Sequence, residues 1–171
     1  MNSTQLQPTE CPDYFNKYID LLGEVGLVEC LQQYKDSFTS FLEDIPLGRL
    51  DMAYEEGKWN IKDIVQHLMD TERVLQYRAL YFARDPGTEL HGFDHNLFAQ
   101  NAKLSLGNKK QLLLDYDIVR QSSIQLFKSF SERELLNCGI MSGQSASVRA
   151  IGFFMCGHQK HHMNIIKQRY L

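Results

Sequence analysis

The chain has 171 residues, a formal net charge of −3, 43% hydrophobic residues and 23% charged residues, which is typical of one globular domain with a sizeable core. A nucleic-acid-binding protein would need a basic face, and a membrane protein would need an apolar run of roughly 18 residues or more; the sequence shows neither. We expect one domain over residues 1–171, in which residues 1–12 form a flexible segment without the features of a signal peptide.

The four cysteines are scattered along the chain and form no C-x-x-C pair. We expect reduced thiols in a cytoplasmic protein, since a disulfide framework would need denser spacing. Cys156 is expected to fill space in the core. These residues are Cys11, Cys30, Cys138 and Cys156.

Apolar residues recur at three- and four-residue steps in four stretches, which predicts four long helices. The second of them has a clear start: Asn60 can cap it, Asp63 favours its positive end, and Trp59 can pack against Ile64. With little strand signal, the expected fold class is all-α, a four-helix bundle. The predicted helices are Val28–Ile45, Ile61–Arg84, Lys109–Phe130 and Ser147–Tyr170.

The connection Asp85–Asn108 is too long for a simple turn between adjacent helices. It can run back along the bundle, so we predict a crossover between the second and third helices and an up-down-down-up topology. Phe93 and Phe98 would pack this linker down, on or near a short helical turn. Under that topology the start of the second helix and the latter half of the fourth lie at the same end.

Two histidines four residues apart share one face of the last predicted helix. His158 and His162 project about 6 Å apart along its axis, a spacing that grips one metal ion and leaves room for a ligand from another helix. The predicted topology brings His67 to the same end. A lone histidine on an apolar face is usually a hydrogen-bonded core residue, but unpaired buried imidazoles cost about 1–3 kcal/mol each. We therefore predict a metal site formed by His67, His158 and His162, whose affinity falls below pH ~6.5 as the rings protonate.

The other histidines are weaker candidates. His161 lies one position off the seam and is either a surface residue or the alternative ligand. His91 and His95 are expected to face solvent, with a lid role for one of them as the alternative. Three further residues could contact a polar substrate, although a surface role is the simpler interpretation: Arg78, Asp94 and Arg169.

Known catalytic metal motifs are absent. Gln159 and Lys160 follow His158, so there is no H-E-x-x-H sequence and no glutamate base of the metalloprotease kind. There is no E-x-x-H pair either, which argues against a di-iron bundle. Gly152 and Gly157 interrupt the last helix, either for close helix packing or to leave room for a metal or ligand.

Several stretches resemble a known family: Gly57–Arg73, Tyr77–Leu80, Phe82–Arg84 and the ending Ser147–Leu171. They are similar to the DinB-like family, and the resemblance covers nearly the whole chain after the first dozen residues. The resemblance implies an up-down-down-up four-helix bundle with His67, His158 and His162 as a metal triad, occupied by zinc or nickel with water completing the coordination. It also implies one of three activities: a low-molecular-weight-thiol S-transferase, a mycothiol-dependent isomerase or a metal-dependent hydrolase.

Three neutral histidines with one open position are typical of a catalytic rather than a structural zinc site. Such a site can activate water or hold a thiol as the nucleophilic thiolate, without a base from the protein. We therefore expect a metal-dependent thiol S-transferase acting on small molecules, with a hydrolase as the alternative. A non-catalytic metal-binding stress-response bundle, a metal-free interaction module and a homodimer all remain open.

Overall fold

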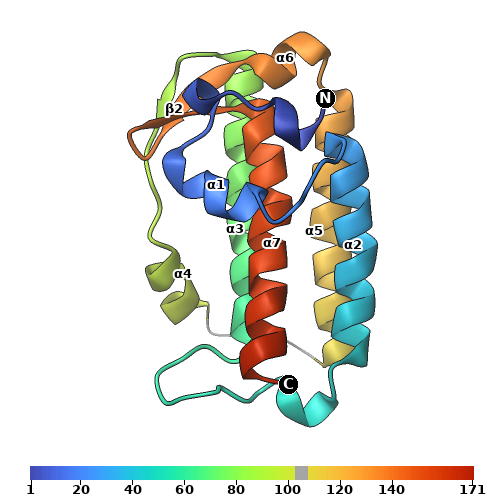
Figure 1. The fold of residues 1–171 in the computed structure, drawn as a ribbon. Coiled ribbons are helices and arrows are strands. Elements are labelled where there is room, and N and C mark those ends of the chain that lie inside the picture. The colour runs from blue at the N-terminus through green and yellow to red at the C-terminus, as the bar shows by residue number, and fades with distance from the viewer. Residues whose placement is uncertain (103–107) are drawn as a thin grey trace.

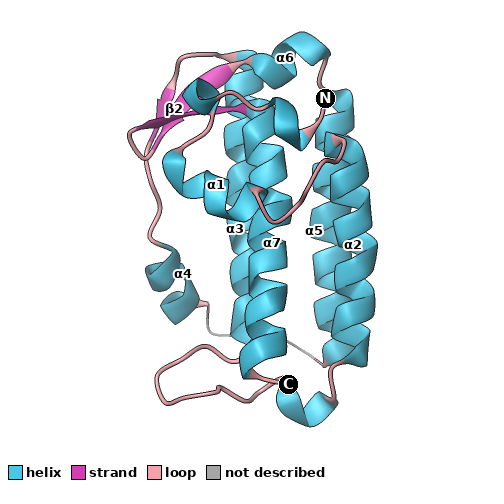
Figure 2. Cartoon of the chain, in the orientation of Figure 1, coloured by secondary structure: helices cyan, strands magenta, loops and turns pink. Residues whose placement is uncertain are grey.

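The computed structural model describes residues 1–102 and 108–171, and four long helices standing side by side dominate it (Figures 1 and 2). Each begins and ends at, or within one residue of, the predicted bounds, so the mostly helical bundle is confirmed. Within the described residues, no helix has both the length and the hydropathy that crossing a bilayer needs. The four helices are α2 (Leu27–Asp44), α3 (Ile61–Arg84), α5 (Lys109–Ser129) and α7 (Val148–Arg169).

Polar contacts between helices define their relative directions. Glu72 pairs with Arg120, and one turn later Gln76 donates a hydrogen bond to Ser123, so α3 and α5 run in the same direction. In Figure 1 both rise from the lower end of the bundle, whereas α2 and α7 descend. The predicted crossover between α3 and α5 includes residues 103–107, which lie outside the described residues.

The start of α3 and the end of α7 meet at the lower end of the bundle. Asn60 Oδ1 accepts a hydrogen bond from the Asp63 backbone at 2.9 Å, and the Asp63 carboxylate accepts one from the Asn60 backbone at 3.0 Å. The predicted N-cap of α3 is therefore confirmed. The Tyr170 hydroxyl donates to the Trp59 carbonyl at 2.6 Å, which ties the last turn of α7 to the residue before this cap. Helices α3 and α7 therefore lie against each other and run in opposite directions.

Short helices cover one side and the upper end of the bundle (Figure 1). The short helices are α1 (Asp13–Ile19), α4 (His95–Asn101) and α6 (Glu132–Leu136), with 3₁₀ turns at Ser3–Gln5, Pro8–Glu10 and Leu47–Arg49. Helix α1 packs on α7, where the rings of Phe15 and Phe154 stack with their centroids 3.8 Å apart. No residue of α4 is buried.

Two glycines let α7 pack closely. A Cβ at Gly157 would lie 2.4 Å from the Tyr18 carbonyl oxygen, and one at Gly152 would lie 2.7 Å from Leu27 Cδ1. Both contacts are with packed elements and not with the histidines. The close-packing interpretation of these glycines is therefore the one the structure supports.

A small sheet makes the all-α expectation incomplete. Strands β2 (Cys138–Met141) and β3 (Gln144–Ser147) form an antiparallel hairpin, and β1 (Glu89–Leu90) pairs parallel with β2. The two-residue turn places Ser142 at φ 52° and Gly143 at φ 76°, the left-handed pair that favours tight hairpins. The signal in the sequence was this Ser-Gly pair, which is weaker than Asn-Gly, between two short strands.

Residues 1–12, expected to be flexible, pack against the bundle. Arg149 of α7 donates two hydrogen bonds to the Glu10 carboxylate, and both side chains are buried. The Ser3 backbone also donates to the Val25 carbonyl at 3.0 Å. A buried ion pair of this kind holds the segment in place, and a sequence pattern could not reveal a partner so far along the chain.

Candidate metal centre

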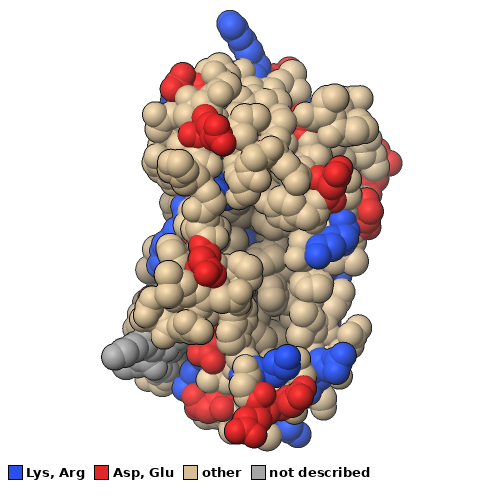
Figure 3. All heavy atoms as spheres, turned by 90° about the vertical axis from the view of Figure 1, so that its left-hand side faces the viewer, with Lys and Arg blue, Asp and Glu red and all other residues tan. Residues whose placement is uncertain are grey.

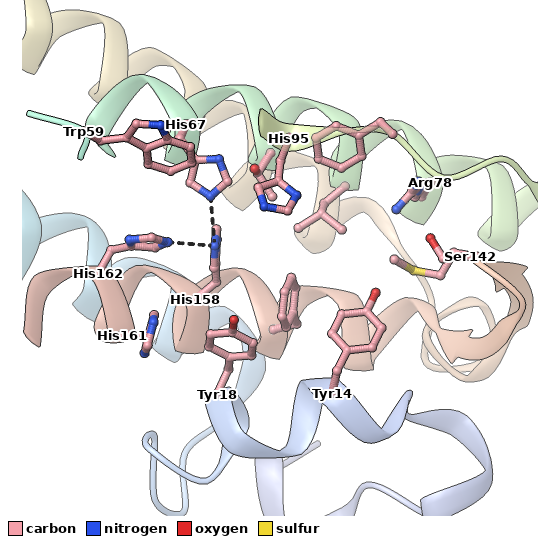
Figure 4. Close-up of a pocket in the computed structure, with 15 residues that line it drawn as sticks. Tyr14, Tyr18, Trp59, His67, Arg78, His95, Ser142, His158, His161 and His162 are labelled. Carbon is pink, nitrogen blue, oxygen red and sulfur yellow. Dashed lines mark hydrogen bonds between the residues drawn. The ribbon is translucent and has the colours of Figure 1, made fainter. Parts of the chain in front are cut away.

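The antiparallel pairing of α3 and α7 brings three predicted histidines together (Figure 4). His67 lies on the second turn of α3, and His158 and His162 lie on successive turns of the facing half of α7. His158 occupies the middle: its Nε2 is 3.2 Å from His67 Nε2 and 3.1 Å from His162 Nε2. One ring nitrogen from each residue lies within 4.8 Å of the others.

These separations fit a single divalent ion. Nitrogens that lie ~2.0–2.1 Å from a tetrahedral ion are about 3.3 Å from one another. Hydrogen bonds alone account for the cluster less well, because a neutral Nε2 offers either one N–H or one lone pair. His158 Nε2 faces two nitrogens at hydrogen-bond distance and can satisfy only one of them. The buried Nδ1 of His162 has no partner among the described residues.

Burial keeps the three rings neutral. It lowers the pKa of His67 to about 4 and that of His162 to about 3, with nearby histidines adding to both effects. The pKa of His158 is well below its usual value for the same reasons. Neutral imidazole is the form that binds a metal. The expected loss of affinity below pH ~6.5 therefore has to be moved to lower pH, because the folded protein resists protonation of these rings.

The remaining histidines lie around this cluster. His161 packs edge-on against Tyr18, with ring centroids 5.1 Å apart, and does not join the three converging nitrogens. His95, at the start of α4, is exposed but lies 5.6 Å from the His67 ring, so it forms part of the wall above the cluster. His91 is exposed, and its carbonyl accepts a hydrogen bond from Arg78.

A cavity of about 420 Å³ opens beside the histidines (Figure 4). Its wall is built from α1, α3, the linker around α4, the β2–β3 turn and α7. Among the described residues that line it there is no aspartate or glutamate, so the charged and polar groups that they contribute are cationic or neutral. The lining residues are Tyr14, Tyr18, Trp59, His67, Thr71, Leu75, Arg78, Phe93, His95, Met141, Ser142, Phe154, His158, His161 and His162.

The three polar residues considered for substrate contact have different positions. Arg78 is buried and lines the cavity. Asp94 caps α4 by accepting hydrogen bonds from the backbone of the next turn. Arg169 lies over the ring of Tyr54 at the end of α7, away from the cavity lining. Only the first therefore belongs to the site.

The sequence did not point to the wall formed by α1. Tyr14 and Tyr18 face the cavity from this short helix, and the residue after each of them, Phe15 and Ile19, is buried. The four-residue spacing of those two apolar residues was the available signal. A pattern of only two apolar residues is too short to distinguish a packed turn of helix from a loop.

The comparisons agree with this architecture. The sequence matches the DinB superfamily over residues 31–166. No curated protein matches it. The structure is similar to that of YfiT from Bacillus subtilis, described as a probable metal-dependent hydrolase with an unusual four-helix bundle topology, with a TM-score of 0.71 and 13% identity over 96% of this chain and 90% of YfiT. A match over most of the chain, with the same bundle in a solved structure, shows that this chain belongs to the DinB superfamily.

Proposed function

We propose that the chain is a metal-dependent enzyme in which His67, His158 and His162 hold one divalent ion, zinc or nickel. The observation that carries the proposal is the convergence of three neutral imidazoles at the wall of an open cavity. A structural site would be closed by a fourth protein ligand. Within the described residues no cysteine, aspartate or glutamate joins the three histidines.

We further propose transfer of a low-molecular-weight thiol to an electrophile, in the cytoplasm, where Cys11, Cys30, Cys138 and Cys156 stay reduced. A divalent ion supplies Lewis acidity, which lowers the pKa of a bound thiol or water. The protein's own contribution is to orient three neutral rings, to exclude bulk water with Trp59 and Phe154, and to leave space for a small molecule. The described residues of the cavity lining include no carboxylate, so they offer no general base of that kind to a nucleophile.

The second candidate is a metal-dependent hydrolase. It is favoured by the description of YfiT, whose fold this chain shares. The same histidine cluster would serve either reaction, since water and thiols compete for one open position. A sensor that binds metal without turnover is the remaining alternative.

The test begins with metal content. The chain is purified without an affinity column that carries nickel, and bound metals are measured by mass spectrometry. The loaded protein is then assayed with a chloronitroarene electrophile and four thiols (bacillithiol, mycothiol, glutathione and coenzyme A), and separately with ester and amide substrates. Conjugation that is lost in His158→Ala but kept in His161→Ala supports the transferase, whereas hydrolysis with the same dependence supports the second candidate. A metal-loaded protein inert in both assays contradicts an enzymatic role.

A further inference from the structure

The cavity has a second polar end, opposite the histidines. Arg78 follows His67 by eleven residues on α3, which is about three helical turns, so both side chains project from the same face with Cα atoms about 16 Å apart. Figure 4 shows the histidines at one end of the cavity and Arg78 at the other, near Tyr14 and Ser142. Figure 3 views the side that carries α4 and the hairpin, where the surface is hollowed near its middle and uncharged residues predominate.

Arg78 differs from the other two buried arginines. Arg120 is paired with the carboxylate of Glu72, and Arg149 with that of Glu10. Arg78 is only 3% exposed, yet within the described residues no carboxylate lies within ion-pair distance of it. Burial of a charge without a counter-ion costs free energy. The described residues supply no counter-ion to this guanidinium, so one would have to come from a ligand.

The contacts that Arg78 does make leave most of its donors free. One terminal nitrogen donates to the His91 carbonyl at 2.8 Å, and the guanidinium lies over the ring of Phe93 at 5.5 Å. A guanidinium carries five N–H donors in a plane, suited to the two oxygens of a carboxylate or phosphate. Burial lowers the pKa of Arg78, but an arginine remains charged at neutral pH.

The stretch between the two ends is mostly apolar. Leu75 of α3 and Phe154 of α7 line it, together with the hydroxyl-bearing Thr71, which lies between His67 and Leu75 on α3. A ligand that used both ends would therefore have an anionic group at one end, a reacting group at the other and an apolar or neutral stretch between them. Side chains on a helix lean toward its N-terminus, and the Arg78 side chain is longer than that of His67, so the span between the two ends is about 10–16 Å.

We propose that Arg78 forms an anion-binding subsite, and that the substrate is an elongated small molecule with a carboxylate or phosphate group about 10–16 Å from its reacting group. The subsite stands by itself. The statement that the other end of the ligand reaches the histidines rests on the proposed function.

The first experiment tests the subsite in metal-free protein. Decanoate, decyl phosphate and the neutral decanamide are titrated by calorimetry into the wild type, Arg78→Met and Arg78→Lys. Arg73→Met is the matched control, because Arg73 lies on the same helix but is 52% exposed and outside the cavity lining. We expect the better anion to bind wild type at least about tenfold more tightly than the amide, because charge-assisted hydrogen bonds are strong in a partly buried site.

The variants then assign this preference. Arg78→Met should abolish it, Arg78→Lys should keep part of it, and the control should keep all of it. Whichever of decanoate and decyl phosphate binds more tightly identifies the anion. Equal binding of anion and amide by wild type overturns the proposal, and this comparison needs no variant to fold. A preference for the anion over the amide that survives in Arg78→Met also overturns the proposal. A lowered melting temperature of that variant would then indicate that Arg78 anchors the linker through the His91 carbonyl.

The second experiment measures the span in zinc-loaded protein. ω-Mercapto acids from mercaptohexanoic to mercaptohexadecanoic acid are compared with the ω-hydroxy thiols of equal length. The affinity advantage of the acid should be greatest at one intermediate length. The advantage should disappear at every length in Arg78→Met, whereas His158→Ala should keep an advantage of the acid but lose the length optimum. A carboxylate preference in the first experiment without any length optimum in the second would retain the subsite and contradict the proposed thiol chemistry at the histidines.

Discussion

Glu72 of α3 and Arg120 of α5 form a two-bonded ion pair inside the bundle, with distances of 2.7 Å from Nε to Oε1 and 2.8 Å from Nη2 to Oε2. Ser123 donates a third hydrogen bond to the same carboxylate at 2.6 Å. Arg120 is 1% exposed and Glu72 is 5% exposed. The pair joins two helices that run in the same direction, behind the wall that carries the histidines.

Removing one member of this pair should be costly. Glu72→Ala leaves the Arg120 guanidinium buried without a counter-ion, and we expect the free energy of unfolding to fall by about 3–5 kcal/mol. The double variant Glu72→Leu/Arg120→Met should lose less, because no charge remains buried. Urea unfolding measures both, with Glu29→Ala, on the exposed face of α2, as the control. A single variant as stable as the control would contradict a structural role for the pair.

His158→Ala should abolish metal binding while the helices remain. His158 Nε2 is the nitrogen that both other rings approach, so its loss leaves only two protein ligands, too few to hold an ion well. The apolar core does not depend on this ring, and helix content by circular dichroism should be close to wild type. Metal affinity is followed by the fluorescence of Trp59, the only tryptophan in the chain, whose ring lies 4.9 Å from that of His67. His161→Ala should bind metal as wild type does, and a loss there would assign the ligands differently.

Metal-free protein should lose stability as the pH falls below ~6.5. Burial lowers the pKa of His67 from 6.5 in the unfolded chain to about 4 in the folded state. Between these values the unfolded chain takes up a proton that the folded protein does not, so stability rises with pH across this window and is flat above it. The effect of this ring is on the order of 1–3 kcal/mol. Urea midpoints from pH ~7.5 to ~4.5 measure the slope.

The control for this pH dependence is His67→Asn, which removes the titrating ring. Its slope should be shallower than that of the wild type over the same window. In the folded protein, proton competition with a metal ion should become strong only as the pH approaches about 4 to 5, given the lowered pKa values. An affinity that already collapses near pH ~6.5 would indicate that these rings are more hydrated than the structure shows.

Gly157→Ala should disturb α1 more than α7. The added methyl group would lie 2.4 Å from the Tyr18 carbonyl oxygen, and a backbone atom cannot move aside as a side chain can. We expect a loss of about 1–3 kcal/mol, as for other overpacked sites, and a lowered melting temperature. Gly48→Ala is the matched control, because a Cβ at Gly48 would meet nothing within 4 Å. Equal melting temperatures for both variants would contradict the close packing of α1.

The sequence predicted the long helices well because each of them carries a long apolar stripe and a marked boundary, as at Asn60. It also placed His67 near the His158 and His162 pair, since helix spacing and the length of the linker restrict the arrangement. The parts that it missed depend on contacts between distant residues. Glu10 finds Arg149, and Tyr14 reaches the cavity through packing of α1 on α7. No local pattern encodes such pairings.

The short α4, none of whose residues is buried, has a consequence for how this protein can diverge. The rings that would hold a metal are fixed by helices of the central bundle, whereas Tyr14, Phe93 and Ser142 come from appended segments. Substitutions or insertions in α4 and the linker around it cost the core little, because no residue of α4 is buried and loop length has only a weak effect on stability. The wall of the cavity beside α4 can therefore change in shape and chemistry, while the histidine cluster and the melting temperature of the bundle remain nearly constant.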